Sequence, residues 1–163
     1  MSMRSRVRPA VLAAFGSLLL IGTASAAEYT TLNLSIAVDK PVDVVWKKVG
    51  GYCDISAWLK MTCTMTAGNG ELGSIRRLND RIDEIMVAKS AYSYTYTQPT
   101  TTILYHGTLE VVPDGKNKSK ILYSLIWDQA PLADAAAKTQ DKERREKLFN
   151  DALASMKKIS EEK

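Results

Sequence analysis

The single histidine, His106, is the residue whose type most directly suggests acid–base chemistry, because imidazole titrates near neutral pH. It lies in an alternating segment in which Ile103, Tyr105 and Leu109 share one face and His106 falls on the other. Alternation of this kind is typical of a half-buried strand, so His106 is predicted to point outward. A general base must reach its substrate, and we therefore assign no catalytic residue.

The segment from Gly68 to Gly73 matches the pattern G-x-G-x-x-G letter for letter. In a dinucleotide site a helix begins at the third glycine, so that its N-terminus meets the pyrophosphate. Here the residues that follow, 74–78, have the pattern of a strand. The sequence therefore predicts a glycine-rich hairpin turn and no nucleotide cofactor.

Arg76 and Glu84 lie at nearly equal distances on either side of an Asn79-Asp80 turn. On a hairpin they are opposite each other on one face. If that face points inward they form a buried ion pair, which is costly to desolvate and is retained mostly where it has a role. If it points outward the pair contributes little. We favour the inward arrangement, because the neighbouring Arg77 can take the outward position.

Three tyrosines, Tyr92, Tyr94 and Tyr96, alternate along one predicted strand with small hydroxyl side chains. Tyrosine is common in sheets, so they fit an ordinary half-buried strand. They equally fit the wall of a cavity, where each ring offers an apolar surface and a hydroxyl. Both interpretations stay open at the level of the sequence.

The elements that must position these residues follow from periodicity. A strand is predicted over 31–38, a short helix after Pro41 that ends at Gly50-Gly51, and a second short helix over 55–59. Six strands in a meander are predicted between Met61 and Asp128, separated by turn signals. After Pro131 an apolar stripe recurs at three- and four-residue steps and indicates one long helix. The fold class is α+β: a seven-stranded antiparallel sheet covered by that C-terminal helix.

Residues 1–26 have the three parts of a cleavable signal peptide: arginines at the start, an apolar run over 10–21, and Ala24-Ser25-Ala26 before the cleavage point. We expect export to the periplasm or secretion, one domain over 27–163, and no membrane anchor after cleavage. Cleavage removes three of the arginine charges, so the net charge falls from +4 to about +1. A nucleic-acid partner needs a basic surface and is therefore not expected.

Two cysteines, Cys53 and Cys63, belong to the predicted mature chain. With one histidine and no CxxC motif they are too few to hold structural zinc, and no metal site is expected. In an oxidising compartment a pair of cysteines usually bridges, and a Cys53–Cys63 disulfide is predicted.

Several segments together resemble the START-like (Bet v 1-like, SRPBCC) superfamily, within it the branch described as polyketide cyclase/dehydrase and lipid transport. The residues that carry the resemblance are Pro41–Trp46, Asp54–Trp58, Gly73–Leu78, Glu84, Tyr92–Tyr94 and Tyr105–Leu109. The resemblance covers nearly all of 27–163 and implies a helix-grip fold with a hydrophobic cavity. No catalytic set of the cyclases maps onto this sequence residue by residue.

We therefore expect a cavity between the sheet and the C-terminal helix, because the inward strand residues and the helix stripe must meet. Its predicted lining is Trp58, Arg76, Glu84, Tyr92, Tyr94, Tyr105, Tyr123, Trp127, Phe149 and Leu153. The expected function is binding or carrying an apolar or amphipathic small molecule. The alternatives are a cyclase or dehydratase that uses a cavity acid–base group, and an accessory protein to a periplasmic enzyme.

Overall fold

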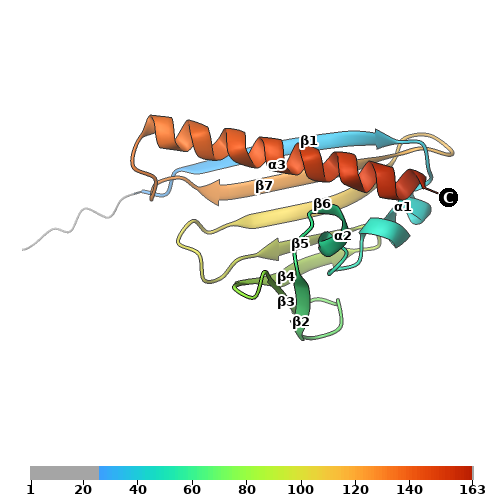
Figure 1. The fold of residues 1–163 in the computed structure, drawn as a ribbon, viewed down its shortest axis with the longest axis horizontal. Helices are drawn as coiled ribbons and strands as arrows, with labels where there is room; N and C mark the ends of the chain where they lie inside the picture. The colour runs from blue at the N-terminus through green and yellow to red at the C-terminus, as the bar shows by residue number, and fades with distance from the viewer. Residues whose placement is uncertain (1–25, 163) are drawn as a thin grey trace, which may run out of the picture.

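The computed structural model describes residues 26–162, which form a seven-stranded antiparallel sheet and three helices (Figure 1). The elements are β1 (Tyr29–Val38), α1 (Val42–Val49), α2 (Ile55–Trp58), β2 (Cys63–Ala67), β3 (Ile75–Leu78), β4 (Ile82–Ser90), β5 (Ser93–Thr97), β6 (His106–Pro113), β7 (Ser119–Asp128) and α3 (Ala135–Glu161). This is the predicted α+β helix-grip architecture. The predicted signal peptide, apart from its last residue, lies outside the described residues.

The sheet has the strand order β1-β7-β6-β5-β4-β3-β2, so β2 to β7 form a meander and β1 closes the far edge beside β7. Buried and exposed side chains alternate along β7, with Ile121, Tyr123, Leu125 and Trp127 on the buried face. This period of two, visible in the sequence, buries one face of the sheet against the helices.

Helix α3 covers that face (Figure 1). It begins after Pro131, where the Asp134 side chain caps it by accepting a hydrogen bond of 2.8 Å from the backbone N–H of Ala137. Its buried stripe is centred on Phe149, Leu153 and Met156. Among the strands, α3 contacts β1 most and β7 next. The helix therefore lies along one side of the sheet, and the face of β3 to β5 needs another cover.

The two short helices and the segment that follows them provide this cover. Ile55 and Trp58 of α2 are buried, and Cys53 and Cys63 form the predicted disulfide, with their Cα atoms 5.5 Å apart. The bridge ties Cys53, two residues before α2, to the first residue of β2. It thereby holds α2 against the end of the sheet that α3 leaves open.

The glycine-rich segment is a turn, as predicted, since it runs directly into β3. Gly68, Gly70 and Gly73 have φ of 75°, 89° and 83°, a backbone region that glycine enters without a steric cost. Within residues 26–162, no helix is long and apolar enough to cross a membrane. No group of three or more His, Cys, Asp or Glu side chains in the same range is arranged to hold a metal ion.

Candidate ligand-binding site

A pocket of about 270 Å³ lies between α3, α2 and the β3–β5 part of the sheet. Most of its lining side chains are apolar, and a few polar groups are placed among them. We call it the inner pocket, and its lining residues are Ile55, Leu59, Met61, Leu78, Ile82, Glu84, Tyr96, Gln98, Tyr105, Arg144, Arg145, Leu148 and Phe149. This composition is typical of small-molecule sites.

Glu84 supplies the one carboxylate among the lining residues of the inner pocket, and this carboxylate forms an ion pair with Arg76. The turn at Asn79 and Asp80 sets Arg76 opposite Glu84 in the register of β3 and β4. The Nε atom of Arg76 donates to Oε2 of Glu84 at 2.7 Å, and Nε2 of Gln98 donates to Oε1 at 2.8 Å. Arg76 and Glu84 are 0% and 1% exposed, so the inward arrangement is the one formed.

Aromatic rings surround the buried guanidinium. The Cζ atom of Arg76 lies 4.3 Å from the ring centroid of Tyr52 and 4.8 Å from that of Tyr96, distances suited to cation–π attraction. Nη1 also donates to the backbone carbonyl of Tyr52. Burial opposes the charge on Arg76, but its electrostatic interactions with neighbours, among them Tyr94 and the Glu84 carboxylate, outweigh burial and raise the pKa of Arg76. The guanidinium therefore stays charged inside the protein.

The buried tyrosines in the pocket wall, Tyr96 and Tyr105, and Tyr123 behind it are neutral hydrogen-bonding groups. The hydroxyls of Tyr96 and Tyr123 are 2.8 Å apart and share a hydrogen bond. Burial raises the pKa of Tyr96, Tyr123 and Tyr105 above that of a free phenol. At neutral pH these phenols can donate or accept hydrogen bonds, but they are not bases.

Arg145 closes one side of the inner pocket from α3. Its guanidinium lies 4.8 Å from the ring centroid of Trp127 and 5.2 Å from that of Tyr105. Its Nε atom donates to Oδ2 of Asp141 at 2.9 Å, one turn earlier on the helix. The stacking and the ion pair hold this long side chain in place, so the rim is ordered before any ligand binds.

The structure divides the ten predicted lining residues among several places. Glu84, Tyr105 and Phe149 line the inner pocket, and Trp58 lines a second pocket beside it. Tyr94 lines a third pocket, between α1 and the glycine-rich turn. The remaining buried members form the core behind these walls: Arg76, Tyr123, Trp127 and Leu153.

Tyr92 differs from the expectation. It lies in the turn before β5 and is 38% exposed, with its ring edge-on to Trp46 at 6.5 Å between centroids. It does not line the inner pocket. Tyr92 continues the alternation of Tyr94 and Tyr96, but β5 begins only at Ser93, so Tyr92 lies in the turn outside the covered face of the sheet.

The sequence did not indicate most of the inner pocket's apolar wall, above all Leu59, Met61, Leu78 and Ile82. These residues come from the link after α2 and from a short hairpin, where no long periodic pattern marks an inward face. Tyr96 is one of the three alternating tyrosines but is not among the predicted lining residues. Its pairing with Gly107 across β5 and β6 is the signal that identifies it, because a glycine opposite an aromatic residue leaves space for the ring.

No protein-family model and no curated protein sequence matches this chain. Solved structures match it in fold. A protein from Nitrosospira multiformis is 24% identical, with a TM-score of 0.60 over 78% of this chain and 96% of that one. The Zhui aromatase/cyclase from Streptomyces sp. R1128 is 12% identical, with a TM-score of 0.68 over 82% and 94% of the two chains.

The protein Ara h 8.0201 matches at 16% identity, with a TM-score of 0.55 over 79% of this chain and 98% of that one. Likeness at these identities establishes the fold. Residues 26–162 have the START-like (Bet v 1-like) fold, as the resemblance in the sequence implied.

Proposed function

We propose that this protein binds or carries a small apolar or amphipathic molecule in the inner pocket. The observation that carries the proposal is the pocket itself: about 270 Å³ between sheet and helix, apolar except at Glu84, Gln98, Tyr96, Tyr105 and the two arginines of α3. The pocket is a partly open cleft between the layers of the fold, so a small molecule can enter it from solvent and be covered on several sides. Its volume suits a ligand smaller than a typical drug.

The polar groups support a ligand with one or two hydrogen-bonding atoms on an apolar frame. Two nitrogens of Arg76 contact Oε2 of Glu84, whereas Oε1 accepts one hydrogen bond, from Gln98, and keeps a further acceptor site. A ligand hydroxyl that reaches Glu84 would donate to it in a low-dielectric surrounding. Such a contact would fix the orientation of the ligand and add little to its affinity, because the apolar wall supplies most of the binding free energy.

A second candidate function is a cyclase or dehydratase reaction with Glu84 as the acid–base group. The position of its carboxylate on the pocket wall favours this candidate, and the Zhui protein with the same fold is an aromatase/cyclase. The ion pair with Arg76 and the hydrogen bond from Gln98 hold the carboxylate against the pocket wall, so a proton transfer to a substrate would have to disrupt these contacts. Binding without turnover is therefore our first proposal.

We also propose that the functional chain is residues 27–163, acting outside the cytoplasm. The Cys53–Cys63 disulfide supports this, because disulfides persist mainly in oxidising compartments. Edman or mass-spectrometric analysis of the protein from its native source should find Ala27 as the first residue. An intact chain that begins at Met1 would contradict this proposal and leave the proposal of ligand binding unaffected.

The test of binding uses a probe and two matched variants on one strand. Ile82 of β4 lines the inner pocket, whereas Val87 of β4 is 45% exposed. Calorimetric titration with decan-1-ol should show binding to the wild type and to Val87→Trp, and its loss in Ile82→Trp, whose indole fills the pocket. Circular dichroism checks that both variants fold. Equal binding by both variants, or none by the wild type, would refute the proposal.

A further inference from the structure

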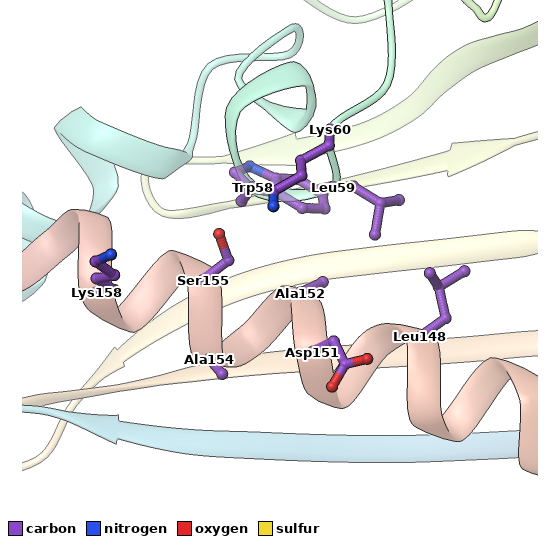
Figure 2. A pocket seen from close by; sticks show the side chains of 9 residues that line it. All are labelled: Trp58, Leu59, Lys60, Leu148, Asp151, Ala152, Ala154, Ser155 and Lys158. Atoms are coloured by element: carbon purple, nitrogen blue, oxygen red, sulfur yellow. The ribbon is translucent and has the colours of Figure 1, made fainter.

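A second pocket of about 520 Å³ lies outside the inner one, between α3 and the end of α2 (Figure 2). We call it the outer groove. Trp58, Leu59 and Lys60 line one side of it, and Leu148, Ser155 and Lys158 of α3 line the other. Ala152 lies between Leu148 and Ser155 on α3, so the helix presents small side chains to the middle of the groove.

The outer groove carries a net positive charge. Lys60 and Lys158 stand on opposite sides of it, and neither forms an ion pair within residues 26–162. Asp151 is the one acid in the lining, and Lys147 neutralises it at 2.8 Å. Figure 2 shows the Lys60 side chain extending past Trp58 toward α3, and the Ser155 hydroxyl pointing into the same gap.

The backbone of Lys60 supports this placement of its ammonium group. Lys60 has φ of 53°, in the left-handed region that side chains other than glycine rarely adopt. Because residue 60 follows directly on α2, this conformation turns the chain toward β2 while the lysine side chain stays over the groove. Strain of this kind persists where the surrounding structure holds it, here between the disulfide and the sheet.

The outer groove and the inner pocket adjoin. Leu59 and Leu148 belong to the lining of both. In Figure 2 they project from opposite sides into one gap between the α2 segment and α3. Leu148 is 40% exposed, so its side chain is free to change rotamer on the nanosecond scale. The two leucines thus form an apolar constriction between a charged space outside and an apolar one inside.

We propose that the outer groove binds the anionic head of an amphipathic ligand whose apolar tail passes between Leu59 and Leu148 into the inner pocket. This inference rests on the proposed function and adds the chemical class of the ligand. The ammonium groups of Lys60 and Lys158 pair with the anion, and the Ser155 hydroxyl is a donor beside it.

The test compares two probes with the same tail and different heads, decanoate and decan-1-ol. The double variant Lys60→Ala/Lys158→Ala should bind decanoate about tenfold more weakly than the wild type, because two exposed ion pairs together contribute about that factor. Its affinity for decan-1-ol should change less than twofold. The matched control Lys116→Ala/Lys142→Ala removes the same charge from exposed positions that line neither pocket and should leave both probes unchanged.

Two further measurements separate head from tail. Raising the salt concentration from about 0.02 M to about 0.5 M should weaken the binding of decanoate and leave the binding of decan-1-ol unchanged. Ile82→Trp should abolish binding of both, since both tails occupy the inner pocket. Decanoate that still binds to Ile82→Trp would overturn the inference, because its tail would then lie elsewhere.

The failures of the two proposals are distinguishable. A wild type that binds decan-1-ol but not decanoate would overturn the anionic-head inference and leave the proposed function standing. Weaker decanoate binding by the control variant as well would also overturn the anionic-head inference alone, since it would show an effect of overall charge. A wild type that binds neither probe would refute the proposed function, and the inference with it.

Discussion

Tyr96 lies over Gly107, its partner in the antiparallel register of β5 and β6, and leaves no room there for a side chain. A Cβ atom at position 107 would lie 2.4 Å from the Cζ atom of the tyrosine ring. The hydrogen bond between the hydroxyls of Tyr96 and Tyr123 holds the ring in this position. Since Tyr96 is part of the inner pocket's wall, a glycine on a neighbouring strand sets the shape of the site.

Gly107→Ala should therefore lower the free energy of unfolding by about 1–3 kcal/mol, the usual cost of overpacking a core. Urea unfolding measures the change. In a Tyr96→Ala background the same substitution should cost much less, because the ring that it meets is gone. An equal cost in both backgrounds would show that Tyr96 is not the group that excludes a side chain at position 107.

Glu84→Gln should lower the free energy of unfolding by about 3 kcal/mol, because it leaves the buried Arg76 guanidinium without a counter-charge. Asp83→Asn is the matched control. Asp83 pairs with Arg77 on the same two strands, at 2.7 Å, but on the exposed face. Its urea midpoint should stay close to that of the wild type. Equal midpoints for the two variants would contradict the buried role of Glu84.

Replacing both members of the Cys53–Cys63 bridge with serine should lower the free energy of unfolding by about 2–3 kcal/mol, the value expected for a short closed loop. Thermal unfolding with and without reductant measures it. The wild type should lose stability on reduction, whereas the double variant should not respond. A wild type that is indifferent to reductant would show that the bridge is absent or contributes nothing.

The free energy of unfolding should fall steeply with pH in the alkaline range. Burial raises the pKa of Tyr94, Tyr96, Tyr105 and Tyr123, so the folded state keeps these phenols protonated. The stability that they contribute is complete below the unfolded-state pKa of about 10 and falls as the pH rises above it. Each adds up to about 1.4 kcal/mol per pH unit to the slope.

Tyrosinate absorbance and near-ultraviolet circular dichroism, recorded together against pH, check this prediction. The absorbance of the buried tyrosines should rise in the same narrow pH range in which the circular dichroism of the fold is lost. Ionisation of these tyrosines at pH 10–11 with the native circular dichroism retained would contradict their burial.

The architecture could be predicted from local patterns. Period-two alternation marked the strands, the stripe around Phe149 and Leu153 marked the long helix, and turn residues marked most of the hairpins. Equal spacing about Asn79-Asp80 was enough to place Arg76 opposite Glu84. Each of these features depends on neighbours in the chain or on one hairpin register, and the sequence specifies both.

The lining of the site was harder to predict. The expectation centred the cavity on β6, β7 and the helix stripe, whereas Tyr123, Trp127 and Leu153 are buried and line none of the three pockets described above. The reason is the position of α3 along β1 and β7, which closes the sheet there and leaves β3 to β5 uncovered. Residues of the link after α2, such as Leu59 and Met61, then become the opposite wall.

The sequence by itself therefore determined the elements, their order, the inward face of the long, clearly alternating strands, the position of Arg76 opposite Glu84, and the disulfide partners. These are consequences of backbone periodicity, turn chemistry and the number of cysteines. Only the tertiary structure decided which inward side chains border open space and which pack against one another. That choice depends on where one rigid 27-residue helix rests across a curved sheet, and no local pattern in the chain encodes that position.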